Sequence, residues 1–189
     1  MTKREQIVAA ADELFYQQGF EHTSFAHIAN SVNISRGNFY YHFKSKDDIL
    51  NAVISLRLNR TQAMLEQWEN AGGDPIERIH CFINILITNK SKIMKFGCPV
   101  GTLTSELNKL DHAALDAANS VFTLFRTWLV GQIEQLDLSE PSDELAMHLL
   151  ARSQGIATLA SAFNDEAIIQ NEVIQLHHWL DTQLEQVNR

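Results

Sequence analysis

The sequence contains few prolines, glycines and cysteines. Its 189 residues include three prolines, eight glycines and two cysteines. Alternating runs of β-branched residues between turn residues are missing, which argues against a sheet-based fold. The two cysteines, Cys81 and Cys98, are too few for a disulfide framework, and no ligands for zinc are spaced around them. We expect both thiols to be reduced.

Membrane spans, targeting segments and catalytic motifs are also missing. No apolar run approaches the length of a membrane helix, and the N-terminus runs directly into an amphipathic stretch. A nucleophile with its base, a paired-carboxylate site and a cofactor motif are not found. Asp181 lies one helical turn after the adjacent His177 and His178, a spacing that can hold a metal, but an acid and imidazole pair without a third convergent ligand is a weak metal site. The sequence therefore predicts a cytoplasmic non-enzyme with no cofactor, metal or membrane partner.

Basic charge is scarce except in one segment. The net charge is −8, which at first sight argues against nucleic acid, because phosphate neutralisation supplies most non-specific affinity. However, residues 1–50 hold five Lys and Arg against six Asp and Glu, while the remainder holds ten against seventeen. Residues 35–46 contain Arg36, Lys44 and Lys46 and no acid. A small basic face is therefore expected there.

Apolar residues recur at intervals of three and four, which predicts an all-α fold. Glycine or proline punctuation and N-cap residues divide the chain into about nine helices. The first ends at Gly19, the second begins near Ser24, and the third follows Ser35. The others are expected over 45–71, 75–93, 99–110, 111–136, 142–163 and 165–187. The sequence therefore predicts a chain of short helices up to about residue 50 and of mostly longer helices over 51–189.

Residues 24–46 carry the most specific pattern. Two short helices are expected on either side of a turn at Asn33, since asparagine tolerates the left-handed backbone. Phe39 and Phe43, one turn apart, predict the buried side of the second short helix. Its other side is polar, aromatic and basic. This arrangement is typical of a helix-turn-helix that reads DNA.

The segment Ile34-Ser35-Arg36-Gly37-Asn38-Phe39-Tyr40-Tyr41-His42-Phe43-Lys44-Ser45-Lys46-Asp47-Asp48-Ile49-Leu50 resembles the signature of the tetracycline-repressor (TetR) family. The resemblance covers roughly Ile7–Leu50, and the expected nine-helix chain is also similar to the family's fold. It implies a homodimeric transcriptional repressor that binds double-stranded operator DNA. We therefore predict a helix-turn-helix DNA-binding domain over 1–50 and a helical ligand-binding and dimerisation domain over 51–189. The resemblance also implies a small-molecule effector, which the sequence does not identify.

Particular side chains are predicted to contact DNA. Arg36 and Asn38 are the side chains best suited to bases, arginine to guanine and asparagine to adenine. Tyrosine, histidine and lysine suit phosphate oxygens, and Gly37 permits close backbone approach. The full predicted set is Ser24, Ser35, Arg36, Gly37, Asn38, Tyr40, Tyr41, His42 and Lys46.

The C-terminal helices predict a dimer interface and an effector pocket. Small residues along the penultimate helix would let a partner helix approach closely. The predicted interface is Ala146, Leu150, Ser153, Ala157, Ala160, Leu176, Trp179 and Leu180. The predicted pocket lining is Phe82, Leu86, Cys98, Phe122, Phe125 and Trp128, although an aromatic stripe at helical spacing also suits a plain core.

Two questions stay open in the sequence. Cys98 precedes Pro99 at an expected helix N-terminus, where a thiolate is stabilised, so it suits either a sensor for electrophiles or a small residue at a helix junction. The whole chain also suits a helical protein-interaction module without DNA binding. That alternative leaves the polar, aromatic face of residues 40–46 unexplained.

Overall fold

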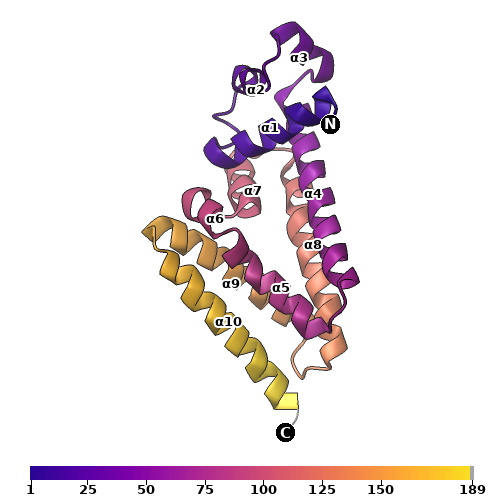
Figure 1. The fold of residues 1–189 in the computed structure, drawn as a ribbon, viewed down its shortest axis with the longest axis vertical. Helices are drawn as coiled ribbons and strands as arrows, with labels where there is room; N and C mark the ends of the chain where they lie inside the picture. The colour runs from indigo at the N-terminus through magenta and orange to yellow at the C-terminus, as the bar shows by residue number, and fades with distance from the viewer. Residues whose placement is uncertain (188–189) are drawn as a thin grey trace. The chain divides into compact units, whose positions relative to one another are not determined.

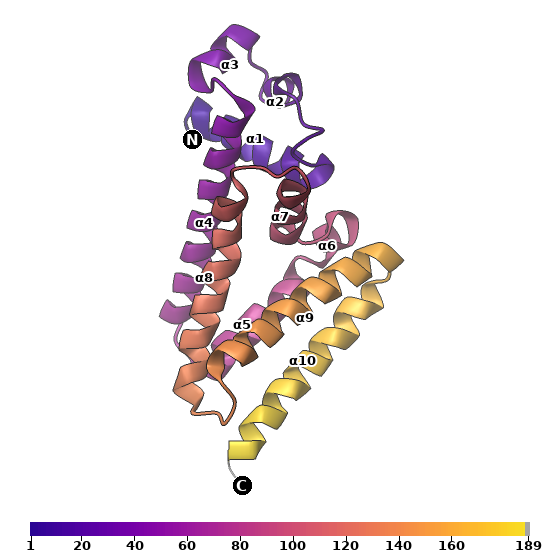
Figure 2. The same ribbon diagram turned by 180° about the vertical axis from the view of Figure 1, so that it is seen from behind.

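The protein is helical throughout the part of the chain that the structure describes. A computed structural model describes residues 1–187, without the side chains of Arg36 and Val187. Over these residues ten α-helices and one short 3-10 helix follow one another, with no strand (Figures 1 and 2). They are α1 (Lys3–Gln18), α2 (Phe25–Ser31), α3 (Arg36–His42), α4 (Lys46–Asn70), α5 (Pro75–Thr88), α6 (Lys90–Phe96), α7 (Pro99–Lys109), α8 (Leu115–Ile133), η1 (Glu134–Leu136), α9 (Ser142–Phe163) and α10 (Glu166–Val187). The all-α prediction is confirmed.

The segment predicted as one helix over 75–93 is two helices. Asn89 separates α5 from α6, and its side-chain amide donates to the carbonyl of Ile85 at 3.1 Å. An asparagine that bonds nearby backbone competes with continuation of the helix. Similarly, α8 begins at Leu115 and not at Asp111, because Asp111 has a left-handed φ of 49°. At both places a polar residue with a non-helical local conformation sets a helix boundary that differs from the predicted one.

One compact unit combines Met1–Thr61 with Pro99–Val121. It contains α1, α2, α3 and α7 with the adjoining parts of α4 and α8. Its buried core includes Ile7, Ala11, Phe15, Phe20, Ile28, Phe39, Phe43, Leu50, Leu103 and Leu107. Residues from α7 thus complete the core on which α2 and α3 rest.

The second unit combines Gln62–Cys98 with Phe122–Arg189. Here α9 and α10 lie side by side and antiparallel, and α5 packs against both (Figures 1 and 2). Its buried core includes Ile79, Phe82, Ile83, Leu86, Leu129, Leu149, Ile156, Ile169, Val173, Leu176 and Leu180.

The two packing units do not follow the domain boundary expected at residue 50. Helix α4 continues unbroken through that position to Asn70, and residues 99–121 pack with the N-terminal segment. The functional division at residue 50 therefore stays a prediction. None of the described helices is long and apolar enough to cross a membrane.

Candidate nucleic-acid interface

Two capped short helices and a tight turn form the candidate interface. Ser24 precedes α2, and its hydroxyl oxygen accepts from the backbone N–H of His27 at 3.2 Å. Ser35 precedes α3 and accepts from the N–H of Asn38 at 3.3 Å. Between the helices, Asn33 has a left-handed φ of 52°, as its position in the sequence predicts. These hydroxyls satisfy N–H groups that have no partner within a helix.

Aromatic packing sets the rotation of α3 about its axis. Phe39 and Phe43 are buried, and the Phe39 ring centroid lies 5.1 Å from that of Phe25 on α2. Tyr40 also contacts Phe25, edge to face, at 5.5 Å. In both ribbon views α3 lies on the opposite side of α1 from α7 (Figures 1 and 2). The buried face of α3 is thereby determined, and its other face is left uncovered by this unit.

The uncovered face of α3 carries most of the predicted DNA-contacting residues. Tyr41 is 79% exposed and Tyr40 is 45% exposed. Gly37 and Asn38 are also exposed, and a Cβ added at Gly37 would meet no atom within 4 Å. Packing within the chain therefore does not require glycine at this position, which agrees with a role in approach to another molecule.

Two further predicted residues lie at the ends of this helix. His42 is half-buried and its ring contacts that of Tyr41 at 5.2 Å. Arg36 is the first residue of α3. The side chain of Arg36, predicted to read a base, lies outside what the structure describes.

Lys46, predicted to contact a DNA phosphate, is half-buried and bonds to backbone of its own chain. Its ammonium donates to the carbonyl oxygens of Phe20 at 2.9 Å and Glu21 at 3.2 Å, and lies 4.2 Å from the Phe20 ring centroid. The predicted contact of Lys46 with a DNA phosphate stays a prediction, for an ammonium that already has partners within its own chain. An ammonium beside carbonyl oxygens and an aromatic face is stabilised by both.

The same turn is held from a second side by Glu106 of α7. Its two carboxylate oxygens each accept one backbone N–H, from Phe20 and Glu21, at 2.9 Å. Gly19 begins this turn with φ 87°, a conformation that side-chain-bearing residues rarely adopt. Lys46 and Glu106 together position the segment that leads from α1 into α2.

Two further basic residues lie near the interface, outside the set predicted to contact DNA. Lys44 is exposed just after α3, and its ammonium donates to the carbonyl of Tyr40 at 2.6 Å. Arg4 of α1 lies with its guanidinium carbon 4.7 Å from the Phe43 ring centroid. Lys44 was visible as a basic residue in an acid-free segment. Arg4 is distant in sequence and gave no such signal.

The residues predicted to line an effector pocket are brought together, but as packed core. Phe82 and Leu86 are buried, and the Phe82 ring meets that of Phe125 at 5.6 Å. Trp128 contacts Trp68 at 5.6 Å and donates from its indole nitrogen to Glu69 at 2.9 Å. Cys98 and Phe122 are partly buried against the same core. A ligand would have to displace some of these side chains.

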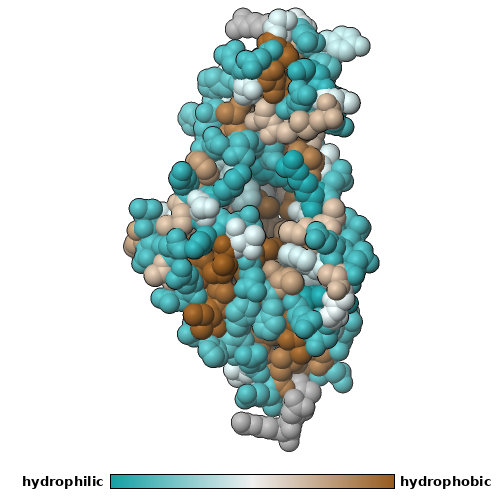
Figure 3. All heavy atoms as spheres, viewed as in Figure 1, coloured by the Kyte–Doolittle hydropathy of each residue, from teal (hydrophilic) through white to brown (hydrophobic). Residues whose placement is uncertain are grey.

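The residues predicted to form the dimer interface mostly face the core of a single copy. Ala146, Leu150, Ser153, Ala157, Ala160, Leu176 and Leu180 are all buried, and only Trp179 is half-buried. Among the described side chains, the large apolar residues that α9 and α10 expose are Met147, Leu159, Phe163 and Ile174. Figure 3 shows hydrophobic atoms gathered over α10 in one view. The predicted interface residues stay a prediction, and in a single copy the small residues pack against this chain's own helices.

Histidines form a separate cluster on α5, α9 and α10. His80 and His177 approach to 2.5 Å between their Nδ1 atoms, and His177 also contacts the side chain of Asn84. Burial and the neighbouring His80 lower the pKa of His177. His148 stacks on Trp179, and burial with the charge of Arg152 lowers its pKa.

The family model and the curated relatives that this chain matches are all bacterial transcriptional regulators. Residues 7–53 match the family described as bacterial regulatory proteins, tetR family. An uncharacterised HTH-type transcriptional regulator from Lactococcus lactis subsp. lactis is 24% identical over 172 residues, covering 89% of this chain and 88% of that protein. HTH-type transcriptional regulator QacR of Staphylococcus aureus is 25% identical over 140 residues, covering 65% and 70%.

Solved structures extend the similarity over nearly the whole chain. A TetR transcriptional regulator from Legionella pneumophila superposes with a TM-score of 0.83 at 28% identity, covering 96% of this chain and 97% of that one. The reduced form of NemR from E. coli superposes with a TM-score of 0.78 at 19% identity, covering 92% and 95%.

Proposed function

Because this chain belongs to the TetR family and is a DNA-binding transcriptional regulator, we propose that it represses transcription until a small molecule releases it from its operator. Regulators of this family are not enzymes, and they act on operator DNA as dimers. The residues that contact the operator, the effector and the second copy are proposed below.

The observation that carries the proposal is the uncovered face of α3. Gly37, Asn38 and Tyr41 are exposed on a helix whose opposite side is anchored by Phe39 and Phe43. Hydroxyl groups suit phosphates and the Asn38 amide suits adenine, so an anchored helix with this face fits the major groove. Arg36, at the helix N-terminus, is proposed to read a guanine. A protein-interaction module would not need this combination of groups.

We place the dimer contact on the outer faces of α9 and α10. Leu159 is 50% exposed and Phe163 is 70% exposed, both on α9. Gly155 lies one turn before Leu159 and is exposed, with nothing within 4 Å of the position its Cβ would take. Large apolar side chains beside a glycine favour close helix packing, and two such faces related by a two-fold axis form a four-helix contact.

We place the effector among the aromatic residues of the second unit. Phe82, Phe122, Phe125 and Trp128 supply apolar walls, and the Glu69 carboxylate is already turned toward the Trp128 indole. A ligand there stabilises a conformation with displaced aromatic side chains, and its affinity is reciprocally coupled to that of DNA. Cys98, packed at the edge of this core, is proposed as a thiol through which an electrophile acts on the same conformation.

Selection of bound genomic fragments, followed by titration of the selected duplex, tests the repressor proposal. The parent should bind the selected site about 1,000-fold or more tightly than unrelated DNA, with an affinity that falls steeply with salt. Tyr41→Ala should weaken binding, whereas Gln67→Ala, at an exposed position of α4 outside the proposed contacts, should not. Failure to enrich any fragment would favour the protein-interaction module.

A further inference from the structure

The backbone turn that leads from α1 into α2 is shaped around a carboxylate of α7. The consecutive N–H groups of Phe20 and Glu21 donate to the two carboxylate oxygens of Glu106, each at 2.9 Å. Successive backbone N–H groups in a turn form a concavity that binds an anion. Glycine is needed at position 19, because a Cβ there would lie 2.9 Å from Oε1 of Glu106. The Glu106 carboxylate therefore occupies a place that the turn leaves open for it.

The side chain of Phe20 packs against the loop that follows α7. Its ring is buried and lies edge to face with the ring of His112, at a centroid distance of 5.2 Å. The His112 Nδ1 atom accepts the N–H of Ala114 at 3.1 Å, so Nε2 carries the ring proton and lies 3.4 Å from the Asp47 carboxylate on α4. The turn is thus held by α7 through Glu106 and by the loop after α7 through His112.

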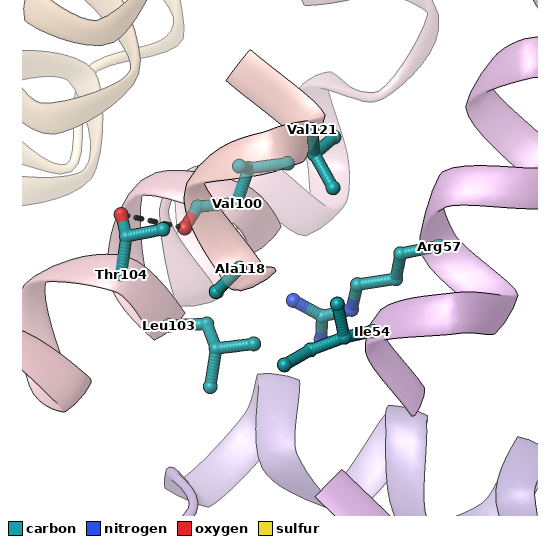
Figure 4. Close-up of a pocket in the computed structure, with 7 residues that line it drawn as sticks. All are labelled: Ile54, Arg57, Val100, Leu103, Thr104, Ala118 and Val121. Carbon is teal, nitrogen blue, oxygen red and sulfur yellow. Dashed lines mark hydrogen bonds between the residues drawn. The ribbon is translucent and has the colours of Figure 1, made fainter. Parts of the chain in front are cut away.

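The N-terminal end of α7 is fixed to α4. Arg57 of α4 is buried, and its Nη1 donates to the carbonyl oxygen of Pro99, the first residue of α7, at 2.5 Å. Figure 4 shows Arg57 and Ile54 facing Leu103 of α7 across a small hollow. Helix α7 therefore joins α4 to the turn before α2, with one contact at its first residue and another at Glu106.

A displacement of this turn would move the DNA-reading helices. Helix α2 begins directly after the turn, and the ring of Phe25 on α2 packs against that of Phe39 on α3 at 5.1 Å. Helix α7 itself lies on the opposite side of α1 from α3 (Figures 1 and 2). Its carboxylate therefore does not face DNA held against α3, and it acts on recognition through the turn.

We propose that Glu106 is a positioning residue that determines how strictly the protein discriminates between half-site spacings. Its contact with Phe20 and Glu21 holds α2 and α3 in one orientation relative to α1, α4 and α7. In a dimer, that orientation sets the spacing at which both copies of α3 can bind together. The inference rests on the proposed repressor function and adds to it a residue outside the DNA-facing surface.

The test compares two operators that differ in half-site spacing. One is the selected near-palindromic duplex, and the other has one extra base pair between its half-sites, which moves one half-site by about 3.4 Å and about a tenth of a turn. The parent should prefer the selected duplex about 100-fold. Glu106→Gln keeps one acceptor oxygen and should reduce this preference about threefold, and Glu106→Ala about tenfold, because charge-assisted hydrogen bonds are lost. A merely structural role would weaken binding to both duplexes alike.

Glu21→Gln is the matched control. It removes the same charge from the same turn, but its side chain is exposed, and its backbone N–H and carbonyl keep their bonds to Glu106 and Lys46. This variant should keep the parent's preference between the two duplexes. A reduced preference in Glu21→Gln would assign the effect to charge alone and overturn the role of the contact. Circular dichroism shows whether each variant keeps its fold.

The remaining outcomes separate the inference from the repressor proposal. An unchanged preference in folded Glu106→Ala would overturn the inference alone, whereas a parent that selects no operator would overturn the repressor function as well. If neither Glu106 variant folds, hydrogen exchange of the parent decides. The amides of Phe20 and Glu21 should exchange slowly in the free protein and more slowly on the selected duplex. Equal exchange in the two states would show that the turn takes no part in recognition.

Discussion

Lys46 and Glu106 bind the same two backbone residues through opposite groups. The lysine ammonium takes the carbonyl oxygens of Phe20 and Glu21, while the glutamate carboxylate takes their N–H groups. The turn before α2 is therefore held in place by a basic residue that sequence reasoning had assigned to DNA. Its role is to position a neighbouring helix.

Replacement of Lys46 should separate positioning from phosphate contact. We expect Lys46→Ala to lower the free energy of unfolding by about 1 kcal/mol, because hydrogen bonds from a charged but partly solvated donor are lost. Operator affinity should fall with little change in its salt dependence. By contrast, Lys44→Ala, at an exposed neighbouring position, should lower the slope of log affinity against log salt by about one. Chemical denaturation and salt titrations measure both effects, and a reduced slope for Lys46→Ala would instead indicate direct phosphate contact.

Arg36 is expected to control sequence preference. Arg36→Ala should cost about 1–3 kcal/mol of operator affinity and relax the preference at one base pair, because a bidentate contact to guanine is lost. A panel of operators with single base-pair changes measures this effect. An equal loss on every operator would show that Arg36 contacts only the backbone.

At the scale of the helix, α9 shows that an apolar pattern does not by itself reveal which face is buried. The helix carries apolar residues around much of its circumference, with Ala157 buried and Leu159 exposed two positions later. The sequence suggested that its small residues meet a partner copy. In the structure they let α9 pack within its own chain.

Charging the exposed face of α9 should divide the dimer. Leu159→Glu is expected to give a folded monomer with weakened operator binding, because a charge is buried unpaired only when two copies meet. Ala157→Glu places the same charge inside one copy, so it should unfold the second unit. Sedimentation and circular dichroism distinguish the two results. A dimeric Leu159→Glu protein would move the interface away from this face.

Much of the candidate nucleic-acid interface could be predicted from residues close together in the sequence. Ser24, Ser35 and Asn33 have short polar side chains whose capping or turn conformations depend on close neighbours, and Phe39 and Phe43 share one face by helical spacing. The contacts that sequence reasoning missed are long-range. Glu106 lies about 85 residues from the turn that it holds, and no local spacing relates the two.

The whole molecule should be less stable in mild acid. Burial lowers the pKa of both His177 and His148. The neighbouring His80 lowers that of His177 further and Arg152 that of His148, while Asp181 and Glu140 respectively oppose the effect. The unfolded chain protonates these rings below about pH 6.5, whereas the folded chain resists protonation. Stability is therefore fully present above that pH and falls as pH decreases through the window between the unfolded and folded pKa values.

Thermal unfolding between pH 7.5 and about pH 5 measures this effect. The parent should lose stability steadily across the range, and His177→Gln with His148→Gln should reduce the slope. His22, an exposed histidine of the first unit, provides the control variant His22→Gln, which should follow the parent. Parallel curves for the parent and the double variant would contradict the assignment to these two rings.

The interleaving of the two units along the chain also sets an order of events during synthesis. The first unit includes α7 and the start of α8. Its last residue is Val121, sixty residues after Thr61. At roughly 5–20 residues per second, a ribosome takes roughly 3–12 s to make that stretch. During this interval the nascent helix-turn-helix lacks Leu103 and Leu107, so part of its apolar surface is open to chaperones. The DNA-reading unit, although it begins at the N-terminus, therefore cannot complete its folding until well over half of the chain has been translated.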